Sequence, residues 1–216
     1  MNTLKLSIIH AEDTFIVIDK PSGLLAVPGR GPEMQDCVVS RLKQDFTGLP
    51  DQPAVHRLDM DTSGLMVVAR TPAAHRELSR QFEHRSVNKE YIALLDGLLP
   101  DNRGTAGKIS LKFRLDPDNR PHQIYDPIQG KTGITHWQKL GNEKNCTRIC
   151  FQPITGRTHQ LRLHAAHELG LGLPIVGDRL YGHGTAPGQL LLHASSLSFI
   201  HPENGQTVNF TSALRF

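Results

Sequence analysis

Short runs of apolar and β-branched residues recur along the chain, and they predict many β-strands. The first run, TFIVID at residues 14–19, ends at a Lys-Pro-Ser-Gly turn signal, and a second apolar strand is expected at LLAV, residues 24–27. LMVVAR, at residues 65–70, has the composition of a buried strand. From residue 87 onward most apolar runs are strand-like, and they cover residues 91–97, 107–113, 133–140, 146–154, 190–200 and 206–210.

Two segments in the first half of the chain have helical spacing. In residues 34–46, Val38, Leu42 and Phe46 lie four positions apart, as they would on one face of an amphipathic helix. Glycine and proline at residues 48–50 end this helix.

A second helix is predicted for residues 71–85. Thr71 can cap it, Pro72 suits the first helical position, and Leu78 and Phe82 would face the core. The spacing therefore predicts both the start and the buried face of this helix.

A third helix is predicted for residues 158–170, THQLRLHAAHELG. It follows Thr155–Gly156 and ends at Gly170, which places Arg157 at or beside its N-terminus.

Strands that follow one another with few intervening helices are typical of an α+β fold with a mixed, largely antiparallel sheet. The 216 residues contain no internal repeat, low-complexity tract or interdomain linker. We therefore expect residues 1–216 to form a single domain.

Composition indicates an ordinary globular protein, with 38% hydrophobic and 21% charged residues. The sequence has neither the apolar region of a signal peptide nor eighteen consecutive apolar residues, so we expect a cytoplasmic protein without a membrane partner. Cys37, Cys146 and Cys150 are an odd number of cysteines without zinc-site spacing, which suits a reducing compartment.

The net charge of +3 permits a nucleic-acid partner without requiring one. The best basic cluster lies on the second predicted helix, where Arg76 and Arg80 are four positions apart and His84, Arg85 and Lys89 follow. An equally good interpretation is a solvated helix face on which glutamates at positions 77 and 83 pair with the arginines.

Several cofactor motifs are incomplete. QGKT at residues 129–132 resembles the end of a phosphate-binding loop, but Tyr125 stands where that loop needs glycine. The crowded histidines at 159, 164 and 167 lack the spacing of a zinc helix, and the glycine pairs do not form a dinucleotide fingerprint. We therefore expect neither a metal nor a cofactor.

The segment HRLDMDTSGL, residues 56–65, places Asp59 and Asp61 between an arginine and a turn signal. By spacing alone, an aspartate beside an arginine is most often a surface ion pair or a turn cap. Carboxylate, arginine and tyrosine chemistry is what remains after the cofactor motifs are excluded.

This segment resembles the signature of the RluA family of RNA pseudouridine synthases. Other segments resemble the same family in the same order, and they are KPSGLLAVPG at 20–29, KEYIALLDG at 89–97, TGRTHQLRLHAA at 155–166, PIVGDRLYG at 174–182 and LLLHASSLSF at 190–199. The resemblance implies a mixed sheet in two lobes with flanking helices and a central active-site cleft. It also implies that uracil is detached from ribose at N1, turned over and reattached through C5, a reaction without a cofactor.

The resemblance also implies roles for individual residues. Asp59 is the nucleophile, and Arg157 of the TGR segment is the cation that keeps it ionised, since burial favours the neutral form of a carboxylate. Arg57 enters the RNA and fills the space left by the flipped base, and Tyr91 stacks on the uracil and accepts the C5 proton. Lys89, with Arg76 and Arg80, would hold phosphates.

The residue types alone leave other interpretations open. Arg157 could contact a phosphate, Arg57 could form a structural salt bridge, and Tyr91 could be a half-buried strand aromatic.

The chain most resembles the compact RluA branch without an S4-type RNA-binding module. That branch modifies a uridine in a tRNA anticodon stem-loop and one in a 23S rRNA hairpin, so we expect RNA to be the partner of this chain. We expect the protein to be a monomer without an obligate protein partner.

Two alternatives to a pseudouridine synthase remain. The first is a nucleosidase or glycosidase, which would use Asp61 as a second acid. The second is a non-catalytic RNA-binding domain, which would not need Asp59.

Overall fold

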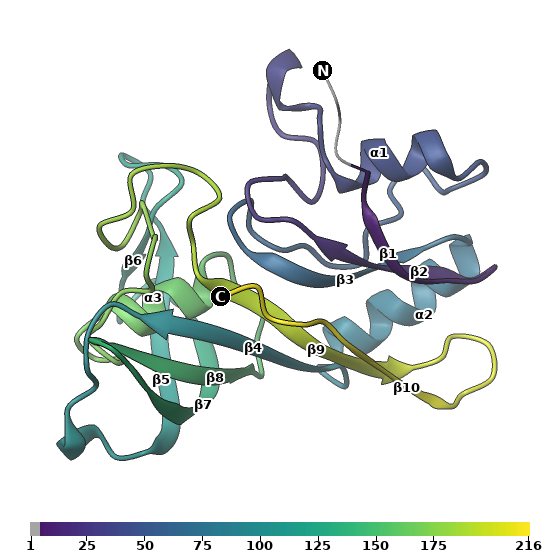
Figure 1. The fold of residues 1–216 in the computed structure, drawn as a ribbon. Coiled ribbons are helices and arrows are strands. Elements are labelled where there is room, and N and C mark those ends of the chain that lie inside the picture. The colour runs from purple at the N-terminus through teal and green to yellow at the C-terminus, as the bar shows by residue number, and fades with distance from the viewer. Residues whose placement is uncertain (1–4) are drawn as a thin grey trace. The chain divides into compact units, whose positions relative to one another are not determined.

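The computed structural model describes residues 5–216, which form two compact units. Unit 1 comprises the chain up to Lys89 together with His193–Arg215, and unit 2 comprises Glu90–Leu192 with Phe216. Figure 1 shows the strands and helices of both units.

Unit 1 is built on five strands in the order β1-β2-β3-β9-β10. Strands β3 and β9 run parallel, and the other neighbours are antiparallel. The elements are β1 (Ser7–Ala11), β2 (Phe15–Lys20), η1 (Pro32–Met34), α1 (Val38–Asp45), β3 (Ser63–Ala69), α2 (Pro72–Glu83), β9 (Leu192–Ile200) and β10 (Thr207–Thr211).

The core of unit 1 explains why these segments fold. Every residue of β2 is buried, which the apolar run Phe15–Ile18 predicts for its first four residues. Asp19 and Lys20 are buried as well. Helix α2 begins as predicted, because the Thr71 side chain accepts a hydrogen bond from the Ala74 N–H (3.1 Å) and Pro72 takes the first position. Leu78 is fully buried in the cluster that joins α2 to the sheet, and Phe82 packs at its edge.

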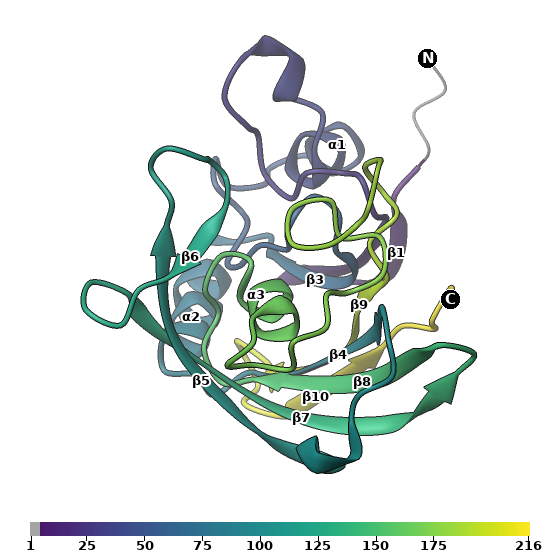
Figure 2. The ribbon, with the colours of Figure 1, turned by 90° about the vertical axis from the view of Figure 1, so that its left-hand side faces the viewer.

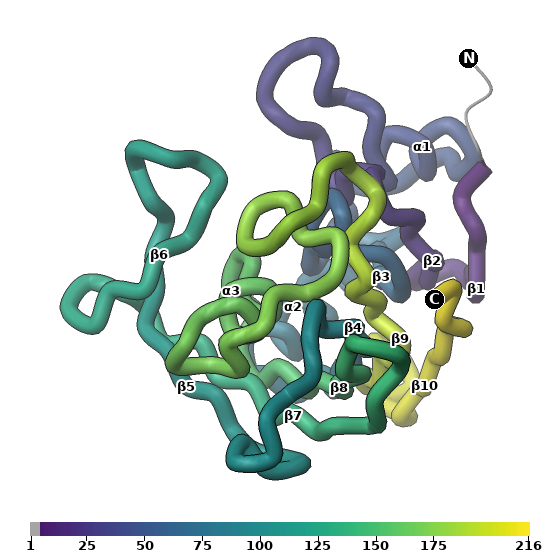
Figure 3. The backbone as a smooth tube through the Cα atoms, turned by 60° about the vertical axis from the view of Figure 1, so that its left-hand side comes forward, coloured from purple at the N-terminus to yellow at the C-terminus, as the bar shows by residue number. Residues whose placement is uncertain are grey.

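Unit 2 is an antiparallel sheet in the order β4-β8-β7-β5-β6, with helix α3 over one of its faces (Figure 2). The loops on either side of β6 extend away from the sheet (Figure 3). The elements are β4 (Asn88–Leu95), η2 (Asp101–Arg103), β5 (Ala106–Leu115), β6 (Gln123–Tyr125), β7 (Lys131–Glu143), β8 (Cys146–Pro153) and α3 (Gln160–Ala166). The predicted α+β class with a mostly antiparallel sheet is confirmed.

The expected strand at residues 24–27 is wrong. Leu25 forms only an isolated bridge with Cys37, and the carbonyls of Leu25 and Ala26 accept the N–H groups of Val38 (2.9 Å) and Val39 (3.3 Å). The segment is apolar because it is packed against the start of α1, and not because it joins the sheet. Helix α1 itself begins at Val38, four residues later than predicted, because Cys37 caps it.

The third predicted helix is too long, because α3 covers only Gln160–Ala166. The chain folds back after α3, and the N–H of Leu171 donates to the carbonyl of His164 (3.0 Å). A Cβ atom on Gly170 would lie 2.0 Å from the His164 carbonyl oxygen, so only glycine fits this return. Gly170 therefore marks the close return of the chain rather than the helix end.

Strands β1 and β6 were not predicted from the sequence, since neither has a continuous apolar run. Across residues 5–216, no helix has both the length and the apolar character needed to cross a membrane.

Candidate active site

Asp59 lies in a tight turn just before β3. The N–H of Thr62 donates to the Asp59 carbonyl (3.1 Å), which closes the turn over residues 59–62. Asp59 is half-buried, whereas Asp61 is only 4% exposed. The less buried of the two carboxylates is thus the one that the family resemblance selects as nucleophile.

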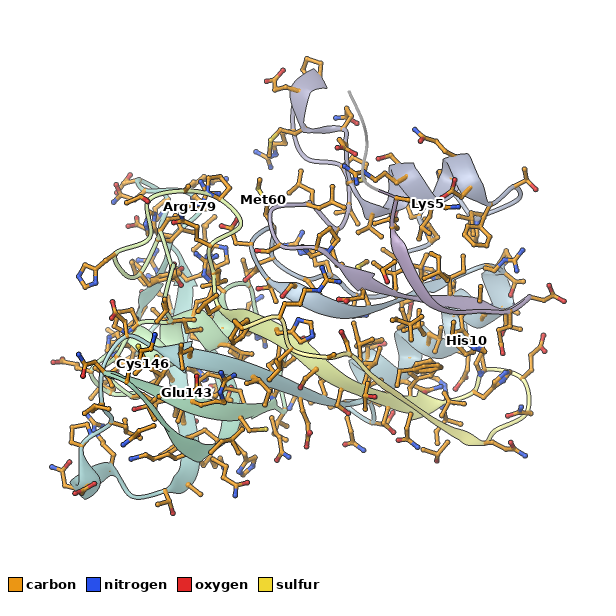
Figure 4. The ribbon with its side chains drawn as sticks, viewed as in Figure 1. Lys5, His10, Met60, Glu143, Cys146 and Arg179 are labelled. Carbon is orange, nitrogen blue, oxygen red and sulfur yellow. The ribbon has the colours of Figure 1, made fainter. Side chains whose placement is uncertain are left out.

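The Asp59 turn is held by a second turn at Pro21–Gly23, which follows β2. The N–H of Gly23 donates to the Met60 carbonyl (2.9 Å), and the Ser22 hydroxyl donates to the Asp61 carbonyl. Met60 is labelled in Figure 4. The KPSG and DMDTSG segments, which begin at residues 20 and 59, are therefore joined by hydrogen bonds into one structure.

Lys20 lies beneath both turns and is fully buried. Its Nζ donates to the carbonyls of Pro21 (3.0 Å), Leu24 (2.7 Å) and Met60 (2.9 Å). Burial lowers the pKa of Lys20 to about 7, against the opposing attraction of Asp59, Asp61 and Asp19. Sequence reasoning assigned no role to Lys20, although its place directly before the Pro-Ser-Gly turn, at the end of a strand that begins with four apolar residues, was a usable signal.

His56 anchors the N-terminal end of the HRLDMDTSGL segment. Its Nε2 accepts the N–H of Val67 on β3 (3.1 Å), and its ring stacks on Phe82 with centroids 4.4 Å apart. Burial, followed by the positive charge of Lys89, lowers the pKa of His56 to about 3, so the ring is neutral and Nδ1 carries the proton. The side chain of Arg57, the next residue, is exposed.

The start of β3 is packed closely against β9. A Cβ on Gly64 would lie 2.3 Å from the Ala194 carbonyl oxygen, and its φ of +108° also favours glycine. The Ser63 hydroxyl lies 2.9 Å from Nδ1 of the buried His193, whose Nε2 lies 3.0 Å from the Ser212 hydroxyl. These contacts fix the strand onto which the Asp59 turn leads.

The basic residues predicted on and just after α2 differ in their surroundings, and Lys89 lies on β4. The side chain of Arg76 is exposed, whereas Arg80 forms a two-bond pair with Glu77, at 3.1 and 2.8 Å. Half-buried Lys89 lies 5.8 Å from the centre of the Phe82 ring, and burial lowers its pKa. The solvated ion-pair interpretation is thus realised at Arg80.

Tyr91 lies in unit 2, on β4. It is half-buried, pairs in register with Phe151 of β8 and packs against the hydrophobic cluster of the unit.

Arg157 has an exposed side chain on a firmly held backbone. Its N–H donates to Oε1 of Gln160 (3.1 Å), and its carbonyl accepts the N–H of Gln160 (3.1 Å). Gln160 is buried and its Nε2 donates to the Ile134 carbonyl (3.0 Å) and the Thr135 hydroxyl (2.9 Å) on β7. One buried glutamine therefore fixes the loop that carries Arg157, at the N-terminal side of α3 as predicted.

A buried polar network lies next to this loop. Arg162 and Asp178 form a two-bond ion pair, at 2.8 and 2.6 Å, and their side chains are 3% and 0% exposed. Burial raises the pKa of Asp178, but the hydrogen bonds and charge of Arg162 and two backbone N–H groups outweigh it, so the net pKa is lowered. The Tyr181 hydroxyl accepts the N–H of Gln123 (2.8 Å) and lies 2.9 Å from Nδ1 of His159.

The network joins residues of two predicted family segments, TGRTHQLRLHAA and PIVGDRLYG, but sequence reasoning did not identify it. Among the described residues, no group of three or more histidine, cysteine, aspartate and glutamate side chains could hold a metal ion. His164, one of the three crowded histidines, lies against the Thr135 hydroxyl (3.0 Å), and burial lowers its pKa to about 4.

Comparison with known proteins shows the family to which the chain belongs. The family described as RNA pseudouridylate synthase matches residues 14–167, which include the Asp59 turn and the Arg157 loop. The chain belongs to this family.

Curated relatives narrow the class further. The chain is 43% identical to the dual-specificity RNA pseudouridine synthase RluA of Haemophilus ducreyi, over 96% of this chain and 93% of the relative. It is 41% identical to the protein of the same name in Escherichia coli K12, over 98% and 94% of the two chains. Within the family, the chain is thus an RNA pseudouridine synthase of the RluA type, an isomerase.

A solved structure also matches the fold. Human RNA Pseudouridylate Synthase Domain Containing 1 superposes with a TM-score of 0.75 at 29% identity, over 96% of this chain and 83% of that one.

Proposed function

We propose that the chain modifies two RNAs, converting one uridine in a tRNA anticodon stem-loop and one in a 23S rRNA hairpin loop. The observation that carries this proposal is the 41–43% identity, over nearly the whole chain, to relatives named as dual-specificity RNA pseudouridine synthases. Specific RNA recognition usually targets unpaired loops, where bases can be turned outward, and this also favours hairpin substrates.

In the proposed reaction the ionised Asp59 attacks the uridine, either at the ribose anomeric carbon or at the base. The bond between ribose C1′ and uracil N1 breaks, the base turns over, and C1′ is joined to C5. The C5 proton leaves, N1 gains a proton, and Asp59 is released unchanged. Tyr91 stacks on the uracil and accepts the C5 proton. Its half-buried position, backed by the hydrophobic cluster of unit 2, supports this role.

The two arginines of the proposed site, Arg57 and Arg157, have separate roles. Arg57 fills the space that the flipped base leaves in the RNA, since a planar guanidinium can stack between bases. Its exposure directly after the anchored His56 supports the assignment. Arg157 supplies positive charge toward Asp59, and the hold of Gln160 on its backbone supports a fixed starting point for this exposed side chain.

Arg76, Arg80 and Lys89 contact phosphates in this proposal. Arg76 can do so directly, whereas Arg80 must exchange Glu77 for a phosphate. Lys89 is less able to reach RNA, because it is half-buried against Phe82.

The proposal is tested with a tRNA anticodon stem-loop and an rRNA hairpin that carry tritium at uracil C5. The protein should release tritium from both RNAs and form pseudouridine at one mapped position in each. Asp59→Asn should abolish release while RNA binding persists, and the matched control Asp51→Asn, an exposed aspartate of the same unit, should be fully active.

Three results would refute the proposal. Release of free uracil would indicate a nucleosidase, RNA binding without turnover would indicate a non-catalytic domain, and activity on one RNA alone would remove the dual specificity.

A further inference from the structure

The ammonium group of Lys20 uses its full donor capacity inside unit 1. A lysine ammonium has three N–H donors, and Lys20 donates to three carbonyls, those of Pro21, Leu24 and Met60. The side chain has no exposure to solvent. Two of the three acceptors belong to the segment that follows β2, and the third belongs to the Asp59 turn, so a single buried group joins the two.

Three carboxylates act on this ammonium. Asp59 and Asp61 flank the Met60 carbonyl that Lys20 binds, and Asp19 precedes Lys20 on β2. Asp19 is already paired with Arg215 (2.8 Å), and the backbone of Asp61 is held by Ser22. Asp59 is the half-buried member of the three, and the proposed reaction needs its carboxylate in the ionised form.

We infer that Lys20 is a positioning residue for the reaction, whose ammonium holds the Asp59 turn in place through the Met60 carbonyl and attracts the carboxylate of Asp59. The inference rests on the proposed function, in which Asp59 is the nucleophile. It adds a cation from the same unit as Asp59 to the one expected from Arg157.

The protonation state of Lys20 decides both effects. A neutral amine has two N–H donors for three carbonyls and carries no charge, so deprotonation loosens the turn and removes the attraction for Asp59 together. Because burial lowers the pKa of Lys20 to about 7, this change falls near neutral pH. The attraction of Asp59 for the ammonium raises the pKa of Lys20 against the larger effect of burial.

The first experiment replaces Lys20 with methionine, which keeps the chain length but has neither charge nor donors. The control is Lys43→Met, since Lys43 is an exposed lysine of the same unit that donates to the Asp51 carbonyl (2.9 Å). We expect Lys20→Met to lower kcat about tenfold or more at pH 6, with KM for the RNA changed less than about twofold.

The wild-type kcat should fall as the pH rises through about 7, where Lys20 loses its proton, whereas the Lys20→Met profile should lack this limb, because methionine has neither charge nor donors at any pH. A merely structural loss would lower kcat by the same factor at every pH. That result, or a profile equal to that of the wild type, would overturn the inference.

A second experiment does not depend on how Lys20→Met folds. Side-chain ¹⁵N NMR of lysine-labelled full-length protein follows the titration of Lys20, in the wild type and in Asp59→Asn. The asparagine variant should lower the pKa of Lys20 by about half a unit or more, whereas Lys43 should titrate unchanged. An unchanged Lys20 titration would refute the coupling to Asp59.

The two proposals fail in different ways. If the wild type forms no pseudouridine, the proposed function is wrong whatever the NMR result. If it forms pseudouridine and Lys20→Met retains the wild-type profile, only the inference about Lys20 is wrong.

Discussion

Replacing Asp178 with asparagine should destabilise the protein by about 3–5 kcal/mol, because it leaves the charge of Arg162 buried without its partner. Both side chains are almost wholly buried, at 3% and 0% exposed, and two hydrogen bonds of 2.8 and 2.6 Å join them. Asparagine is nearly the same size as aspartate and its oxygen can still accept the N–H groups of Leu180 and Tyr181, which Asp178 accepts at 2.9 and 3.0 Å. The loss is therefore mainly electrostatic.

Urea denaturation followed by tryptophan fluorescence measures this effect, since Trp137 lies in the hydrophobic cluster of the same unit. A matched control is Asp126→Asn, in the partly exposed pair that Asp126 forms with Arg114 in this unit. Asp126 also caps its own turn by accepting the N–H groups of Ile128 and Gln129, so asparagine, which can still accept them, isolates the ion pair. We expect the control to lose about 1 kcal/mol or less.

The pH dependence gives a second check. The net pKa of Asp178 is lowered on folding, so its stabilising effect is complete above the usual aspartate range and is lost as the pH falls through its folded value. The difference between wild type and Asp178→Asn should therefore shrink in acid. A loss below about 1 kcal/mol at pH 7 would refute the reasoning, since it would show that water or a second acceptor solvates Arg162.

Four further outcomes are expected. Thr71→Ala should cost about 1 kcal/mol in urea denaturation, because it removes the N-cap of α2. Gly170→Ala should cost more than about 2 kcal/mol, because its Cβ would collide with a backbone carbonyl of α3, while Gly141→Ala, which meets no atom within 4 Å, should cost less than about 0.5 kcal/mol. The free energy of unfolding of the wild type relative to Lys20→Met should rise by up to about 1.4 kcal/mol per pH unit between pH 7 and 10, because the unfolded chain binds the Lys20 proton more tightly. Arg57→Ala should lose most of its activity on a folded hairpin and little on an unstructured strand in tritium-release assays, and equal losses on both would contradict a role in base flipping.

Local signals in the sequence were enough for much of the secondary structure. The apolar run of β2 and the Thr71–Pro72 start of α2 were identified correctly, because a buried strand and an N-cap depend on neighbouring residues. Helix α3 was assigned too many residues, since its end depends on where the chain folds back.

Part of the candidate site could likewise be predicted from the sequence, and part could not. HRLDMDTSGL was sufficient to select Asp59 and Arg57 through family resemblance, and the family assignment is confirmed. The roles of Asp59, Arg57, Tyr91, Arg157 and the basic residues remain predictions. The pairing of Arg80 with Glu77 favours the solvated-face interpretation at that position, and helical spacing had allowed both outcomes.

The sequence by itself determined the family and the fold class, and it selected the segment to which the chemistry is assigned as a prediction, because each is encoded in residues close together in the chain or in their order. Only the tertiary structure decided that Lys20 binds the carbonyl of Met60, that His56 accepts from Val67, and that LLAV packs on α1. Burial and hydrogen bonding between segments far apart in sequence produce these contacts. No periodicity or composition records which distant carbonyl a buried lysine will bind.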